Sequence, residues 1–248
     1  MNREFWEVKA KKYPKPFDEK NLEKTKEIIN KIKAMGVSFS GRSVVDIGCG
    51  TGNYGLLFAG EAKEVFCLDF SKTMIEALAE EVKERGIKNV SWEIASFADF
   101  NPQARKKYFD ISFASMTPAI KTENDVLKME TLSREHCVFI GWAGKRENAL
   151  ADSIISAHGI AHYYPKGFLE VREVLKRRSI SFVQDTFETS WNWSGSIEEA
   201  LEDFSARIKL DGKIPDEKLM RSMLEKEFPS GTVEMTTYAS QGILVWKP

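Results

Sequence analysis

The sequence predicts an α/β protein with a doubly wound, mostly parallel β-sheet, and three observations support this fold class. Short apolar runs alternate with helical patterns, which is typical of strands joined by right-handed crossover helices. One apolar run, 43–47, leads directly into a glycine-rich turn. The next run, 64–69, ends in an aspartate. Buried parallel strands that end in this way are typical of sheets that bind a ligand at their carboxyl edge.

The N-terminal region is expected to be helical. Aromatic residues and lysines alternate over 3–13, which predicts a short amphipathic helix before the break at Pro14. Apolar residues then recur at helical intervals from Glu19 to Met35, and Gly36 is suited to end this second helix.

The central region alternates strands with helices. Ser71 is suited to cap the helix after the second strand, and Gly86 to close it. Thr122 and Asp125 have the spacing of a capping box, which predicts the start of another helix. The expected strands of this region are 43–47, 64–69, 89–94, 109–114 and 137–142.

The pattern changes after residue 142. Residues 143–175 are expected to be polar and helical with an interruption over 157–165, and further helices are expected over 197–210 and 216–228. The last strands are expected over 180–189 and 242–246. The absence of repeats and linkers predicts a single domain, 1–248, with the following parts: N-terminal helices (1–40), a cofactor-binding core (41–143), a lid or substrate segment (144–178), and C-terminal strands and helices (179–248).

Composition excludes several classes of protein. With 42% hydrophobic and 29% charged residues, the chain is expected to be globular, and no apolar run is long enough to span a membrane. The N-terminus lacks a signal-peptide core and the three cysteines lack metal-ligand spacing, so we expect a cytoplasmic protein without a metal. The net charge of −1 makes nucleic acid an improbable partner.

The spacing of the glycines distinguishes between kinds of nucleotide site. The turn reads D-x-G-x-G-x-G from Asp46 to Gly52, and Asp69 follows Gly50 by 19 residues. A dinucleotide site would instead require glycine or alanine at position 53, which is Asn53. A carboxylate at the tip of the second strand can accept both hydroxyls of a ribose, so the ligand is expected to contain a nucleoside.

These motifs resemble those of the class I S-adenosylmethionine-dependent methyltransferases, and the resemblance extends from about Ser43 to Ala143. It implies a seven-stranded Rossmann-like sheet with an N-terminal helical segment and a helical lid insertion. It also implies S-adenosyl-L-methionine as the cofactor. The alternative of a nicotinamide oxidoreductase remains open.

The resemblance also implies roles for individual residues. Gly48, Cys49 and Gly50 would let the backbone approach the amino-acid end of the cofactor, Asp46 would organise the turn, and Asp69 would hold the ribose. The remaining residues expected around the cofactor are Phe70, Ser96, Phe97, Ser115 and Tyr13.

The third strand departs from the family pattern. Many relatives place an aspartate after it to accept the adenine amino group, but here the equivalent positions are Ser96 and Phe97. Adenine recognition would then rest on stacking with Phe70 or Phe97, or on Asp99. The loop 115–120 after the fourth strand would face the transferable methyl group.

Methyl transfer from a sulfonium is a direct displacement, so the enzyme mainly aligns the nucleophile and excludes water. His158, His162 and Tyr163 cluster in the lid segment and are the candidate catalytic residues, because a histidine can take a proton from a hydroxyl, amine or thiol. We expect a small-molecule O, N or S acceptor, and a monomer or homodimer. The alternatives are an RNA or protein methyltransferase and a catalytically silent cofactor-binding module.

Overall fold

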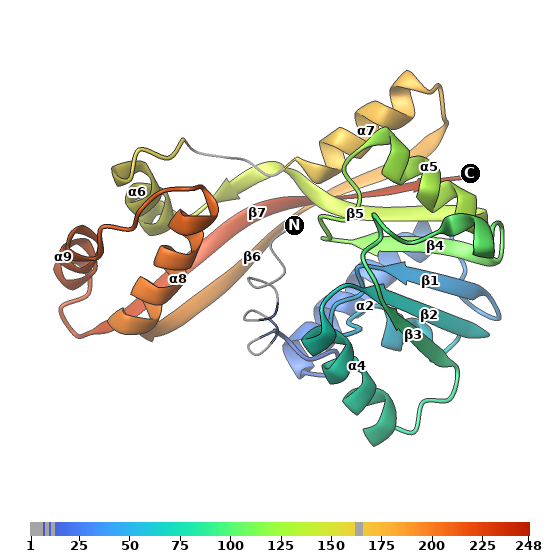
Figure 1. Ribbon diagram of the computed structural model, residues 1–248, viewed down its shortest axis with the longest axis horizontal. Coiled ribbons are helices and arrows are strands. Elements are labelled where there is room, and N and C mark those ends of the chain that lie inside the picture. Colours follow the sequence, from blue (N-terminus) through green and yellow to red (C-terminus); the bar gives the residue numbers. More distant parts are fainter. Residues whose placement is uncertain (1–6, 8–9, 11–12, 162–165) are drawn as a thin grey trace. The chain divides into compact units, whose positions relative to one another are not determined.

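The computed structural model describes residues 7, 10, 13–161 and 166–248, and within them one seven-stranded sheet has the order β3-β2-β1-β4-β5-β7-β6 (Figure 1). The pairs β1–β2, β2–β3, β1–β4 and β4–β5 are all parallel. The chain leaves β1 toward β2 and later returns to place β4 on the other side of β1. The strands are β1 (Ser43–Ile47), β2 (Glu64–Asp69), β3 (Val90–Ile94), β4 (Phe109–Ser115), β5 (Ser133–Glu147), β6 (Phe182–Ser196) and β7 (Thr232–Trp246). The predicted doubly wound α/β fold is confirmed.

The helices begin largely where the sequence predicts. The Ser71 hydroxyl accepts the Met74 amide at 3.2 Å and so caps α4, and Thr122 and Asp125 form the predicted capping box of α5. The predicted helix over 3–13 lies largely outside the described residues. The helices are α2 (Glu19–Ala34), α3 (Gly55–Phe58), α4 (Lys72–Glu84), the 3-10 helix η1 (Pro102–Arg105), α5 (Glu123–Leu132), α6 (Ala149–Ala157), α7 (Gly167–Arg177), α8 (Ile197–Leu210) and α9 (Glu217–Glu227).

The chain forms two compact units. The first unit comprises residues 1–141, 166–186 and 242–248, and the second comprises 142–165 and 187–241. The expected lid segment, 144–178, is therefore divided between the units. That the chain is a single domain stays a prediction.

The core of the first unit surrounds its central strand. Every residue of β1 is buried, and the Phe39 and Phe58 rings stack at 4.1 Å nearby. Burying an aliphatic or aromatic side chain stabilises the fold by about 1.5–3 kcal/mol. The polar turn that follows β1 thus extends from a well-packed strand.

Phe168 of α7 packs where β5 and β7 carry glycines. A Cβ on Gly141 would lie 2.7 Å from the backbone nitrogen of Phe168, and a Cβ on Gly242 would overlap the Phe168 ring. Only a residue without a side chain leaves this space, which explains both glycines.

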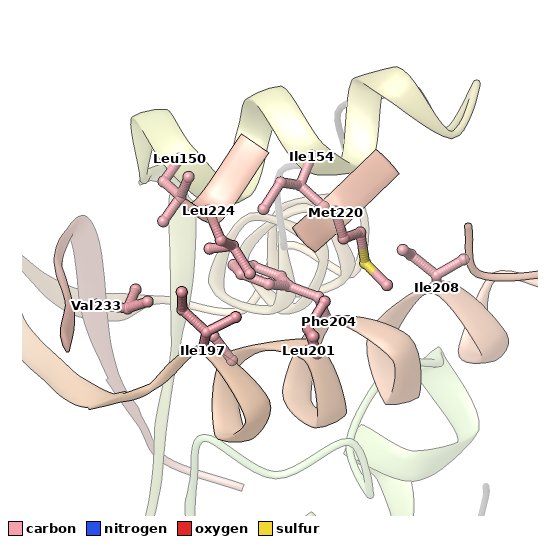
Figure 2. Packing of buried hydrophobic residues seen from close by; sticks show 10 residues of the cluster. Leu150, Ile154, Ile197, Leu201, Phe204, Ile208, Met220, Leu224 and Val233 are labelled. Carbon is pink, nitrogen blue, oxygen red and sulfur yellow. The ribbon is translucent and has the colours of Figure 1, made fainter. Parts of the chain in front are cut away.

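The second unit has a separate core. Side chains from α6, α8, α9 and β7 point toward one another in it (Figure 2). Asn148, which caps α6, also donates to the Thr237 hydroxyl of β7 at 2.9 Å and so ties the helix to the sheet. The labelled members of this core are Leu150, Ile154, Ile197, Leu201, Phe204, Ile208, Met220, Leu224 and Val233.

The predicted bounds of the last three strands are wrong. β5, β6 and β7 each have 15 residues, whereas the sequence predicted strands of six, ten and five residues at 137–142, 180–189 and 242–246. Along β6 partly buried and exposed residues alternate almost throughout. Because the added stretches are polar on one face, they lack the continuous apolar run that identifies a strand buried on both faces.

Across the described residues, no helix is long and apolar enough to cross a membrane. The same residues contain no group of three histidine, cysteine or acidic side chains that could hold a metal ion.

Candidate functional site

The glycine-rich turn follows β1 and has a left-handed backbone. The φ angles of Gly48 and Gly50 are +67° and +56°, values that residues with a Cβ rarely adopt. The Gly48 and Cys49 amides both donate to the Leu68 carbonyl, at 2.7 and 3.1 Å. The turn is therefore fixed against the end of β2.

Asp69, the last residue of β2, connects this turn to α4. Its carboxylate accepts the Gly50 amide and the Ser71 amide, each at 2.9 Å. Burial raises the pKa of the Asp69 carboxyl, although these amide bonds act in the opposite direction. A carboxylate has about four lone-pair positions, so Asp69 can accept further hydroxyl donors.

A cavity of about 140 Å³ lies where four strands end. Five of the predicted site residues line it: Gly48, Asp69, Phe70, Ser96 and Phe97. The other lining residues are Leu68, Ala95, Ala98, Thr117, Pro118, Ala119 and Asp125. The structure thus brings together residues predicted from β1, β2 and β3 that are up to 49 positions apart in the chain.

The loop after β4 lies against the glycine-rich turn. A Cβ on Gly48 would lie 2.7 Å from the Thr117 Cβ, so the two loops touch at that glycine. Met116, beside Thr117, has a φ of +51°, which is a strained conformation for a residue with a side chain. Ser115 ends β4 and is partly buried, but it is not among the residues that line the cavity.

Asp46 and Cys49 are buried and do not line the cavity. The Asp46 carboxylate is buried and accepts the Gly55 amide at 3.0 Å, which fixes the start of α3. Burial raises the pKa of Asp46 to about 7, and the nearby charge of Asp69 adds to the increase. Burial also raises the pKa of the Cys49 thiol well above its ordinary range.

Tyr13 lies over the turn. Its Cε1 would be 3.9 Å from a Cβ on Gly50, and burial together with the charge of Asp69 raises the pKa of its hydroxyl. The adjoining segment is held by the Thr51 hydroxyl, which donates to the Pro14 carbonyl at 3.1 Å. These contacts agree with Tyr13 closing the site from the N-terminal side, which stays a prediction.

Sequence reasoning missed two residues of α5. Asp125 lines the cavity, and the Lys128 ammonium donates to the Phe97 and Ala98 carbonyls at 2.6 and 2.8 Å. The capping box identified Asp125 as the start of a helix, but nothing in the sequence places that helix beside the loop after β3. Asp99, by contrast, is exposed and does not line the cavity.

Of the three candidate catalytic residues the structure describes His158, which belongs to the second unit. His162 and Tyr163 lie outside the described residues. His158 ends α6, its Nδ1 lies 2.8 Å from the Ile154 carbonyl, and its Nε2 accepts the Asp216 amide at 3.0 Å. These two bonds give His158 a structural role in joining α6 to α9. A role as a base would require the bond to Nε2 to open.

We expect His158→Ala to destabilise the protein by about 1–2 kcal/mol, because the substitution removes two hydrogen bonds. Urea denaturation should show this loss, and hydrogen exchange should show a faster-exchanging Asp216 amide. A purely catalytic histidine predicts the reverse result, with turnover lost and stability unchanged.

Comparison with known proteins identifies the family of this chain. A family model described as a methyltransferase domain matches residues 38–227. Uncharacterized RNA methyltransferases from Halalkalibacterium halodurans and Listeria monocytogenes are 33% and 30% identical to the chain over 78 and 93 residues, which is 32% and 38% of this chain. The matched segments cover only 17% and 20% of those relatives' own length. An uncharacterized protein of Haemophilus influenzae is 23% identical over 219 residues, 79% of this chain and 78% of that protein.

Solved structures share the fold at low sequence identity. YcgJ from Bacillus subtilis has a TM-score of 0.55 at 15% identity, over 88% of this chain and 97% of that one. A putative methyltransferase from Bacillus halodurans has a TM-score of 0.55 at 12% identity, over 90% and 99%. A Haemonchus contortus phosphoethanolamine N-methyltransferase, solved with S-adenosyl-L-methionine, has a TM-score of 0.53 at 18% identity, over 90% and 52%.

Proposed function

Because this chain belongs to the methyltransferase domain family, we propose that it binds S-adenosyl-L-methionine in the cavity and transfers the methyl group to a small-molecule oxygen, nitrogen or sulfur nucleophile. The observation that carries this proposal is the cavity itself. It combines a left-handed glycine turn, a buried acid at the tip of the neighbouring strand and apolar rings from the next two loops. The solved methyltransferases with this fold support the choice of cofactor.

The residues present fit such a ligand. A Cβ on Gly50 would make only ordinary van der Waals contact, at 3.9 Å, with Met74 and Tyr13, so this turn leaves room beside its backbone. The Gly48, Cys49 and Gly50 amides are already bonded to Leu68 and Asp69, so the turn contributes room for the ligand. Asp69 would accept the ribose hydroxyls, and Phe70 and Phe97 offer apolar surfaces for the base.

The cofactor supplies a methyl group already activated by its sulfonium, and the chain supplies position and shelter. Thr117 lies against Gly48, where it would limit access of water to the turn. Asp69 and the turn fix one end of the ligand against rigid strands, which favours in-line approach of a nucleophile. A general base is not required for this displacement, so His158, His162 and Tyr163 remain candidates for binding the acceptor or taking its proton.

Calorimetry with S-adenosyl-L-methionine and S-adenosylhomocysteine tests the proposal. Folded protein is expected to bind both with dissociation constants below about 1 mM, the range in which a specific site contributes more than roughly 4 kcal/mol. Formation of S-adenosylhomocysteine with fractionated small molecules would then identify the acceptor. Absence of heat with both compounds would overturn the proposal, and binding without turnover in any fraction would favour a silent binding module.

Asp69→Ala is expected to weaken S-adenosylhomocysteine binding by about 1–3 kcal/mol, since the ribose hydroxyls lose a charged acceptor. Calorimetry measures this change. Asp99→Ala is the matched control, because Asp99 is an acid beside the same site that does not line the cavity. Equal affinity in the two variants would show that the ribose is held elsewhere.

RNA methylation is the second candidate, favoured by the relatives named as RNA methyltransferases. An RNA acceptor predicts methyl incorporation into tRNA or rRNA and association that weakens steeply with salt. The net charge of −1 favours the small-molecule acceptor over RNA. Methylated RNA in an in vitro assay would decide for the alternative.

A further inference from the structure

The loop after β3 carries no acid that faces the cavity. Ser96 and Phe97 occupy the positions where an acceptor for the adenine amino group is expected, and the Ser96 hydroxyl already accepts the Ala98 amide at 3.3 Å. Asp99 does not line the cavity. On the premise of the proposed function, the base therefore needs a polar partner from another element.

Asp125, at the start of α5, is the second acid that lines the cavity, together with Asp69. Its Oδ2 accepts the Lys121 amide, the Thr122 amide and the Thr122 hydroxyl at 3.2, 2.9 and 2.8 Å. Among the described residues, no donor bonds to its Oδ1. One oxygen thus fixes the side chain at the start of α5, while the other is available to a ligand.

Lys128 explains why α5 lies beside this cavity. It follows Asp125 by three positions and therefore lies on the same face of the helix. Its ammonium binds the carbonyls of Phe97 and Ala98 and lies 5.0 Å from the centre of the Phe97 ring. This contact holds the loop after β3 against the helix that carries Asp125.

We propose that Asp125 recognises the exocyclic amino group of adenine and makes the site selective for adenosine ligands over inosine ligands. Asp69, at the tip of β2, and Asp125, at the start of α5, both line the cavity, and Lys128 bonds the helix of Asp125 to the Phe97 and Ala98 carbonyls. A ribose held at Asp69 would direct its base toward this second acid. The amino group of adenine is a donor and pairs with a carboxylate, whereas the 6-oxo group of hypoxanthine is an acceptor and is repelled by it.

The test compares two ligands that differ at position 6 of the base and in the hydrogen that hypoxanthine carries on N1. Calorimetry should give wild-type protein a preference of about tenfold or more for S-adenosylhomocysteine over S-inosylhomocysteine, as expected for a charge-assisted hydrogen bond. Asp125→Asn should reduce the preference to about threefold or less, because an amide can present either a donor or an acceptor. The loss should appear as weaker binding of the adenosyl ligand.

Two further variants separate recognition from helix capping. Glu199→Gln alters the same position of the capping box of α8, in the second unit, and should leave the preference unchanged. Thr122→Val removes a capping hydroxyl but keeps the Asp125 carboxylate, so it should also keep the preference. If Thr122→Val lost the preference as Asp125→Asn does, the geometry of the cap would be responsible and the proposal would be overturned.

The outcomes distinguish this proposal from the proposed function. If the wild-type protein binds neither ligand, the cofactor assignment fails. If it binds both ligands equally, or if Asp125→Asn keeps the full preference, the cofactor assignment stands and the role of Asp125 is refuted.

Discussion

Gly50→Val is expected to reduce the affinity for S-adenosylhomocysteine by about 100-fold or more, which corresponds to roughly 3 kcal/mol of binding free energy. The cause is steric overlap between the valine side chain and the bound ligand. A Cβ at position 50 would lie 3.9 Å from Met74 and Tyr13, which is ordinary van der Waals contact, so the free protein has room for it. Gly50 does not itself line the cavity, but it lies two residues from Gly48, which does, and the proposed ligand would extend along this turn. The variant should therefore lose binding chiefly through the ligand.

The backbone strain of this substitution can be matched elsewhere in the chain. Gly86, after α4, has a φ of +64° against +56° for Gly50, and a Cβ there would meet nothing within 4 Å. Gly86→Val should thus lose similar stability in urea denaturation while retaining the calorimetric affinity of wild type. If both variants bind equally well, the ligand does not lie over the turn. Gly50→Ala serves the same comparison, with Gly86→Ala, should the valine variants not fold.

Asp46→Asn is expected to stabilise the protein above pH 7. Burial raises the pKa of this carboxyl from 3.8 to about 7, so the folded state binds a proton that the unfolded state has lost between these values. Stability therefore falls as pH rises through this interval, by about 1.4 kcal/mol per pH unit and up to about 4 kcal/mol in total. Asparagine mimics the protonated acid at every pH, and its oxygen can still accept the Gly55 amide.

Urea denaturation between pH 5 and pH 8 measures this effect. The wild-type protein should lose more stability over that range than Asp46→Asn, with a remaining slope in the variant from Asp69, whose pKa is also raised. Asp110→Asn is the control of opposite sign: despite its burial, bonds from Ser43 and Arg134 lower the pKa of Asp110. That variant should be destabilised at neutral pH. Parallel pH profiles for Asp46→Asn and wild type would contradict the prediction.

The sequence predicted the first half of the sheet well, for physical reasons that the second half lacks. β1 and β2 have the predicted bounds because both are short, largely apolar runs followed by a glycine or ended by an acid. β6 extends to Ser196 through polar and aromatic residues that no short apolar run identifies. The half-exposed parts of these long strands are stabilised by pairing with neighbouring strands and by the helices of the second unit. Both are tertiary effects.

The candidate site was likewise predictable only in part. Gly48, Asp69, Phe70, Ser96 and Phe97 line the cavity because each directly follows or ends a strand, and parallel strands bring their ends together. Thr117 belongs to the loop 115–120, which was expected at the site, whereas Asp125 belongs to a helix whose approach depends on side-chain contacts, such as the bonds from Lys128 to the loop after β3. Residue spacing does not encode such contacts. The placement of Asp46 beneath the turn likewise follows from its bond to Gly55.

The three long strands also determine how the second unit can be separated from the rest. The polypeptide passes between the units four times, after residues 141, 165, 186 and 241. A single proteolytic cut therefore cannot liberate the second unit as an independent fragment, and no one truncation removes it. Its modular removal would need two simultaneous deletions, one of 142–165 and one of 187–241. Related chains would therefore gain or lose this unit by lengthening or shortening the strands beside the glycines that contact Phe168. They would not do so by exchanging whole terminal segments.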